Sequence, residues 1–312
     1  MASSLSIPSY MRWLPPEATA TLSHLEFQAH GAVDGFISGR HRSHRMGSST
    51  EFAEHRLYAP GDDLRNLDWK LVARRQRYYI KRYVDETNLR ATVLLDVSGS
   101  MSYRGDLASE VHGKRVSKLE YAQYLASALT YLLVKQQDAV GLVTFDTKVR
   151  DYLPAKAQPS QIRTILETVD AIRAGGETDG AAVFHDIAER IPRRGIVFIL
   201  SDLFGDPEEI IRAFHHFRFR HHEVIVMHIM AEEELSFPFT SFSRFQCAET
   251  ASRMNIDPRA LRAGYLEKVR AFLKTLSVGC GQMSIGYEPM STKIPFDEAL
   301  ANCLGRRMLG RG

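Results

Sequence analysis

The chain has 312 residues, of which 44% are hydrophobic and 25% are charged, the balance of an ordinary globular protein. This length is enough for one large α/β domain or for two smaller domains with separate cores. The net charge of +3 is too small to indicate nucleic-acid binding, because phosphate recognition needs a clustered basic face. The three cysteines lie far apart in the sequence and support neither a disulfide framework nor a zinc ribbon.

The N-terminal sequence lacks the basic and then apolar pattern of a secretory signal. No apolar run approaches the roughly 18 residues that a membrane-spanning helix needs. We therefore expect a cytoplasmic protein with no membrane span.

Residues 1–88 form the first region in chain order. Residues 1–18 are rich in serine and proline and predict a loose arm. Helical spacing of apolar residues follows from Thr19 to about Phe36. A turn signal at residues 59–62 precedes a short predicted helix, and residues 78–84 alternate as a strand does. Because no flexible linker follows, we expect this N-terminal region to pack on the rest of the protein.

From residue 89 onward, short apolar runs alternate with helical stretches. The runs at residues 91–96, 139–145, 196–202 and 223–230 are typical of parallel strands covered on both faces. Helices are predicted between and after these runs, at residues 118–137, 160–172, 180–190, 207–218 and 258–276. A strand at residues 282–287 and a last helix at 296–308 follow. This alternation predicts an α/β fold for residues 89–312, with a doubly wound, mostly parallel, Rossmann-like sheet.

Polar side chains gather where two of these apolar runs end. Asp96, Ser98 and Ser100 follow the first run in the spacing DxSxS, and Asp202 ends the run at 196–202. Thr178 lies in a glycine-rich turn before a helix. The carboxyl ends of parallel strands share one edge of a sheet, where ligands of such folds bind. Carboxylate and hydroxyl oxygens suit Mg²⁺ or Mn²⁺ rather than zinc, so we predict a metal site.

Three features follow one another along the chain: the DxSxS motif, Thr178 in a glycine-rich turn, and Asp202 at the end of an apolar run. Together they resemble the metal-ion-dependent adhesion site of von Willebrand factor A-type domains. The resemblance implies that Asp96, Ser98, Ser100, Thr178 and Asp202 are the metal ligands. The alternative is that the serines and Asp202 merely cap the segments that follow them. Capping does not explain why both acids close the most apolar strands.

A second resemblance spans about residues 28–308 and concerns the bacterial family called domain of unknown function 58. The matching elements are Glu51-Phe52, Arg56, Tyr58, Pro60-Gly61-Asp62, Arg65, Asp68-Trp69, Ala73-Arg74, the segment at 118–122 and Arg306-Arg307. Many members carry transmembrane helices before this region, which this sequence does not show. Members are typically encoded beside MoxR-type AAA+ ATPases, so the resemblance implies such a partner.

Two functions are consistent with this pattern. The first is a non-catalytic interaction protein whose bound Mg²⁺ grips a carboxylate of the ATPase or of its client, during maturation or remodelling of proteins. The alternative is a Mg²⁺-dependent hydrolase that activates water at the same ion. No histidine belongs to the motif and both acids are committed to the metal, which favours the first function. Glu177 and Asp179 are the only adjacent carboxylates left for a general base. The polar segment 102–117 is expected to lie beside the metal, to be mobile and to set partner choice, with a tolerated insertion as the alternative.

Overall fold

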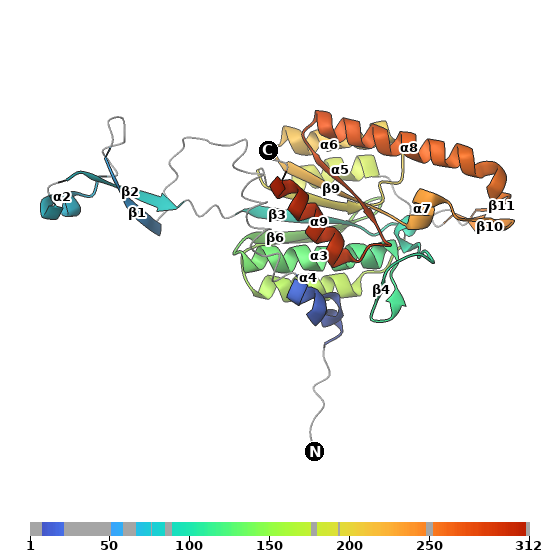
Figure 1. Cartoon of the computed structure of the whole chain (residues 1–312), viewed down its shortest axis with the longest axis horizontal. Coiled ribbons are helices and arrows are strands. Elements are labelled where there is room, and N and C mark those ends of the chain that lie inside the picture. Colours follow the sequence, from blue (N-terminus) through green and yellow to red (C-terminus); the bar gives the residue numbers. More distant parts are fainter. Residues whose placement is uncertain are drawn as a thin grey trace, which may run out of the picture. The chain divides into compact units, whose positions relative to one another are not determined.

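The computed structural model describes residues 8–21, 51–58, 67–75, 77–84, 89–175, 180–192, 194–247 and 252–309 (Figure 1). The chain divides into two compact units. The smaller comprises residues 37–88, and the larger comprises residues 1–36 together with 89–312. The proposed domain boundary at residue 88 stays a prediction.

A six-stranded sheet forms the centre of the larger unit, in the order β12-β9-β8-β3-β6-β7. Its strands are β3 (Arg90–Asp96), β6 (Ala139–Phe145), β7 (Val149–Lys156), β8 (Ile196–Ser201), β9 (Glu223–Met230) and β12 (Gly286–Ser291). All neighbouring pairs are parallel except β6 with the edge strand β7. This topology confirms the predicted doubly wound, mostly parallel sheet.

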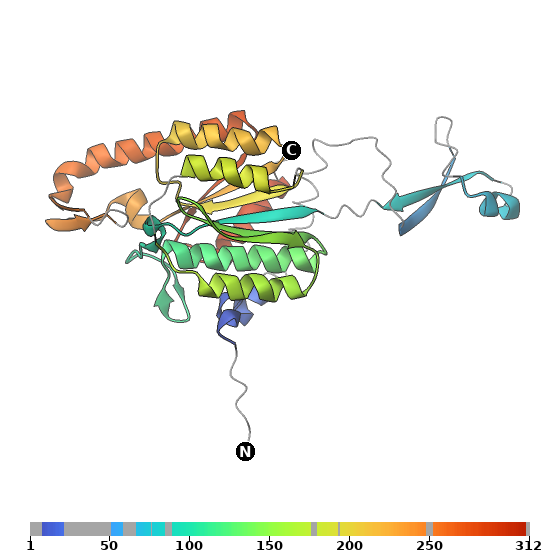
Figure 2. The same ribbon diagram turned by 180° about the vertical axis from the view of Figure 1, so that it is seen from behind.

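Helices cover both faces of the sheet, as Figures 1 and 2 show. On one face α5 packs against α6 and α6 against α8, and on the other α3 contacts α4 and α9. Their bounds are α3 (Lys118–Lys135), α4 (Ser160–Ala171), α5 (Gly180–Arg190), α6 (Pro207–Phe219), α8 (Pro258–Gln282) and α9 (Phe296–Leu309). Because both faces are covered, β6 and β8 are buried along their whole length, which accounts for their continuous apolar sequences.

The N-terminal segment contributes a 3₁₀ turn, η1 (Ser9–Trp13), which packs on α3 and α4. The indole nitrogen of Trp13 donates a hydrogen bond of 3.0 Å to Asp170 at the end of α4. Residues 9–13 are thus an ordered turn that packs on the fold, and not part of the loose arm predicted for residues 1–18. Residues 16–21 are helical, and most of the helix predicted to run to residue 36 lies outside the described residues.

The smaller unit contains a short antiparallel pair, β1 (Glu51–Leu57) and β2 (Tyr79–Val84), with the helix α2 (Trp69–Arg75) between them in sequence. The bridge between Leu67 and Ile80 adds a further contact, and both side chains are buried. The turn predicted at residues 59–62 lies outside the described residues.

The end of the long helix α8 differs from the prediction. The helix was predicted to end at residue 276, but it continues to Gln282. The strand that follows is β12, which begins at Gly286 and not at residue 282 as predicted. Two glycines, Gly279 and Gly281, weakened the helical pattern there. Gly279 has a packing role, because a Cβ at this position would lie 2.4 Å from Cδ1 of Ile211 on α6. The glycine therefore allows α8 and α6 to approach closely.

Short elements at the carboxyl end of the sheet were also not predicted. They are the hairpin β4 (Glu110–Val111) and β5 (Lys114–Arg115), the helix α7 (Glu232–Ser236) and the hairpin β10 (Ser243–Gln246) and β11 (Arg253–Ile256). Among the described residues, no helix is both long enough and apolar enough to cross a membrane.

Candidate metal centre at the carboxyl edge of the sheet

Asp96 and Asp202 lie at the same edge of the sheet. Asp96 is the last residue of β3, and Asp202 directly follows β8. The two strands pair in parallel, with Leu95 opposite Leu200, so the residues after this pair leave the sheet side by side. Both acids are buried, Asp96 completely. The structure therefore brings together the two carboxylates that the sequence placed at strand ends.

The loop after β3 turns its polar groups toward one another. The backbone N–H of Ser98 donates to Oδ1 of Asp96 at 2.9 Å, and the hydroxyl oxygens of Ser98 and Ser100 lie 3.1 Å apart. Adjacent oxygens around an octahedral Mg²⁺, each about 2.0–2.1 Å from the ion, are separated by about 3 Å. The spacing of the two hydroxyls thus fits two neighbouring ligands of such an ion.

Ser201 joins this group from the neighbouring strand. Its hydroxyl donates a 2.6 Å hydrogen bond to Oδ2 of Asp96 and accepts one of 2.9 Å from the backbone N–H of Leu203. Ser201 was not among the residues predicted for this site. Side chains alternate along a strand, so Ser201 and Asp202 were expected on opposite faces, and the pattern did not indicate that Ser201 reaches Asp96.

Burial raises the pKa of Asp96 to about 7, and the negative charge of Asp202 adds to this shift. Hydrogen bonds from Ser201 and Ser98 counteract part of the effect, because they stabilise the ionised form. A buried carboxylate beside a second acid gains stability from a nearby positive charge.

Lys118 supplies such a charge. Its ammonium lies 2.7 Å from Oδ2 of Asp202 and 2.7 Å from Oε1 of Glu234 on α7, and its side chain is only 3% exposed. Burial alone would lower the pKa of Lys118, but the charges of Asp202 and Glu234 and the hydrogen bonds to both outweigh it and raise the pKa above its usual value. Lys118 is therefore a permanent cation within the site.

The fifth predicted ligand, Thr178, lies outside the described residues. The described part of its loop ends at Gly175, whose N–H donates a 3.0 Å hydrogen bond to the carbonyl of Val97. The chain that leads to Thr178 is thus attached to the loop that carries Ser98 and Ser100.

His228 contacts the backbone of Asp202 and is completely buried. One ring nitrogen is 2.6 Å from the hydroxyl of Tyr287 and the other is 2.9 Å from the backbone carbonyl of Asp202. Burial lowers the pKa of His228 to about 4, so the ring is neutral at pH 7. Both nitrogens are engaged in the fold, and the histidine holds the backbone after β8 in place.

The segment 102–117 forms an anchored hairpin beside this edge (Figure 1). Glu233 of α7 accepts a 2.7 Å hydrogen bond from the N–H of Leu107, and the N–H of Ser109 donates to the carbonyl of Thr292 at 2.8 Å. The hairpin ends at Ser117, which caps α3 together with Glu120. These contacts hold both the hairpin and Lys118 next to the candidate site.

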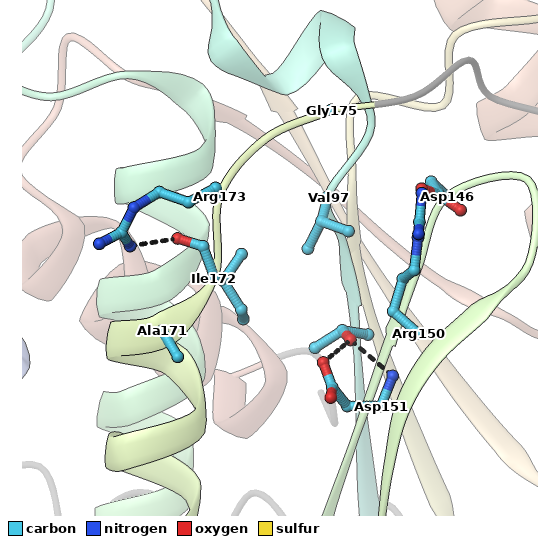
Figure 3. Close-up of a pocket in the computed structure, with 9 residues that line it drawn as sticks. Val97, Asp146, Arg150, Asp151, Ala171, Ile172, Arg173 and Gly175 are labelled. Atoms are coloured by element: carbon cyan, nitrogen blue, oxygen red, sulfur yellow. Dashed lines mark hydrogen bonds and ion pairs between the residues drawn. The ribbon is translucent and has the colours of Figure 1, made fainter.

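A pocket of about 380 Å³ adjoins the loop that follows β3 (Figure 3). Val97 lies between its two sides, with Asp146, Arg150 and Asp151 on one and the end of α4 on the other. Nε of Arg150 donates a 2.6 Å hydrogen bond to Asp146. Charged and apolar groups therefore share the lining of this pocket, and Val97 directly follows Asp96 in the chain.

No three histidine, cysteine, aspartate or glutamate side chains cluster as a metal site within the described part of the chain. A site of the predicted kind has only two acids, because hydroxyl groups provide the other protein oxygens. The metal assignment therefore depends on the geometry of Asp96, Ser98, Ser100 and Asp202.

A sequence model of one protein family matches residues 54–274, and that family is described as "Protein of unknown function DUF58". The chain belongs to this family. A relative in Mycobacterium tuberculosis (strain ATCC 25618 / H37Rv), named only as an uncharacterized protein, is 27% identical over 274 residues. The alignment covers 85% of this chain and 83% of the relative. The family assignment suggested by the charged and aromatic motif is thus confirmed.

Among solved structures, the DUF58 chain is similar to the conserved hypothetical protein BatB from Bacteroides thetaiotaomicron, with 18% identity and a TM-score of 0.41. That alignment covers 70% of this chain and 98% of the other. It is also similar to the SpRpn10 VWA domain, with 10% identity and a TM-score of 0.38, over 68% of this chain and 93% of the other.

Proposed function

We propose that this DUF58 protein is a non-catalytic interaction module that binds a carboxylate of another protein through Mg²⁺ or Mn²⁺. The observation that carries the proposal is the convergence of Asp96, Ser98 and Ser100 next to Asp202 at the carboxyl edge of the sheet. Thr178 is proposed as a further ligand. A divalent ion held by these residues would supply an electrophilic position for an external carboxylate.

The residues of the chain prepare this position in three ways. Ser98 and Ser100 provide neutral oxygens, which leave the charge of a bound cation only partly compensated. Ser201 and the N–H of Ser98 fix both oxygens of Asp96. The pocket beside Val97 offers room for the residues that flank a partner's carboxylate.

The hydrolase alternative needs a general base that faces the metal. His228 is the histidine of the described chain that contacts this site, and both of its nitrogens are bonded within the fold. Lys118 is ion-paired with two carboxylates and remains protonated. Neither side chain is suited to take a proton from water, so we favour the interaction module.

We further propose that the partner is a MoxR-type AAA+ ATPase or its client. Membership in the DUF58 family supports this proposal, because the resemblance to that family implies such a partner.

Capture of a MoxR-type AAA+ ATPase from the same organism tests the proposal. A pull-down compares the wild type with Asp96→Asn, with and without EDTA, and Ser160→Ala serves as a control because Ser160 is exposed on α4. We expect capture only by the wild type and the control, and only in the presence of divalent metal. Equal capture under all conditions would contradict a metal-dependent contact.

A further inference from the structure

Lys118 occupies a position that the helix itself disfavours. It is the first residue of α3, where the helix dipole favours negative rather than positive groups. Its side chain is nevertheless buried, and it makes both of its ion pairs with residues outside the helix. The carboxylates of Asp202 and Glu234 therefore explain its position.

The ammonium acts directly on one of the proposed metal ligands. It contacts Oδ2 of Asp202, whereas Oδ1 of the same carboxylate is 3.3 Å from the backbone nitrogen of Phe204. A cation at this carboxylate meets the positive charge of Lys118 at close range. Because the pair is buried, salt screens this repulsion only weakly.

Glu234 gives the lysine a second partner on a different element. Its other carboxylate oxygen accepts a 2.8 Å hydrogen bond from the N–H of Ala231, so the side chain is fixed at the start of α7. Its side chain is 30% exposed, in contrast to 4% for Asp202. Lys118 thus keeps one ion pair when Asp202 turns toward a metal.

We infer that Lys118 sets the metal affinity of this site by competing with the divalent cation for Asp202. The inference rests on the proposed metal site. In the metal-free protein the ammonium compensates the buried carboxylate, so the edge of the sheet folds without metal. In the metal-bound protein the same positive charge weakens the hold on the cation and adds attraction for an incoming anionic ligand. Metal and partner carboxylate then bind cooperatively, each weakly alone.

The charge of Lys118 and its second partner can be changed separately. Lys118→Met removes the charge and keeps the length of the side chain, so affinity for Mn²⁺ should rise about tenfold, since the buried repulsion is lost. Glu234→Gln leaves Asp202 as the only charged partner of the lysine among the described residues, so affinity should fall. Lys114→Met, at an exposed position of β5, is the matched control and should leave affinity unchanged.

Calorimetric titration of Mn²⁺ into the full-length variants measures these affinities, and thermal melting checks that each variant is folded. Opposite shifts for Lys118→Met and Glu234→Gln support the inference, as does binding gained by Lys118→Met when the wild type binds too weakly to measure. Unchanged or weaker binding by Lys118→Met overturns it. If Lys118→Met does not fold, the direction for Glu234→Gln decides: weaker binding supports the inference, and unchanged or tighter binding overturns it.

Asp96→Asn separates this inference from the metal site itself. If Asp96→Asn abolishes binding while Lys118→Met has no effect, the site stands and the role of Lys118 is rejected. If no variant binds Mn²⁺, or if Asp96→Asn binds as the wild type does, the metal site is wrong and the inference fails with it.

Discussion

Ser201 connects two strands through a side chain rather than through the backbone. Its hydroxyl is 2.6 Å from Oδ2 of Asp96, and both residues are buried. Ser201→Ala leaves the carboxylate without this donor, so we expect a loss of roughly 1–2 kcal/mol in unfolding free energy. Urea denaturation measures the change.

The exposed Ser160→Ala is the control for this experiment and should alter stability by less than roughly 0.5 kcal/mol. Equal stability of Ser201→Ala and the wild type would mean that water replaces the hydroxyl without cost.

At the scale of residues, strand ends were predictable and neighbours across strands were not. Asp96 and Asp202 stood out because each closes an apolar run. Lys118 reaches Asp202 from the start of α3, and Ser201 reaches Asp96 from β8. The position of Ser201 depends on the pairing of β3 with β8. The motif at 118–122 marked Lys118 as a family position, but not as the partner of Asp202.

Two glycines show how the same substitution acts differently in different elements. Gly141 lies within β6, where a Cβ would be 2.7 Å from the backbone oxygen of Leu153 on β7. Backbone atoms cannot move aside as a side chain can, so Gly141→Ala should destabilise the protein by roughly 2 kcal/mol. Gly264 lies in α8, where an added methyl group would meet open space, with no neighbouring atom within 4 Å.

Gly264→Ala should therefore stabilise the protein by roughly 0.5–1 kcal/mol, because alanine favours a helix more than glycine does. Denaturant unfolding of both variants checks the opposite signs. If the unfolding free energy of Gly141→Ala equals that of the wild type, β6 and β7 separate more easily than their pairing implies.

At the scale of elements, long buried segments were predictable. The bounds of β6, β9 and α5 agree with the sequence-based ranges, because their apolar patterns are uninterrupted. The edge strand β7 escaped prediction, since it contains Pro154 and is mostly exposed. The hairpin β4–β5 also lacks an apolar pattern. Hydrogen bonds of Leu107 and Ser109 to distant parts of the fold hold it in place.

On the scale of the whole molecule, aromatic contacts join both ends of the described chain to α3. Tyr124 of α3 lies between Trp13 of η1 and Phe296 of α9, with 4.9 Å between ring centroids in each pair. The sequence predicted packing of the N-terminal region in general. It did not indicate this contact, because the three aromatic residues are far apart in the chain and do not follow one periodic pattern.

The two tryptophans of the chain allow this arrangement to be tested. Trp13 is 4% exposed and Trp69 is 67% exposed. Trp13→Ala removes a buried ring, a hydrogen bond to Asp170 and the contact with Tyr124, so unfolding free energy should fall by roughly 3 kcal/mol. Trp69→Ala should change it by less than roughly 0.5 kcal/mol. Because Trp69→Ala keeps Trp13 as the remaining tryptophan, its fluorescence should be blue-shifted in the native state and shift to red as the sheet unfolds. A red-shifted native spectrum, or equal stability of the two variants, would show that η1 does not hold the N-terminal segment on α3.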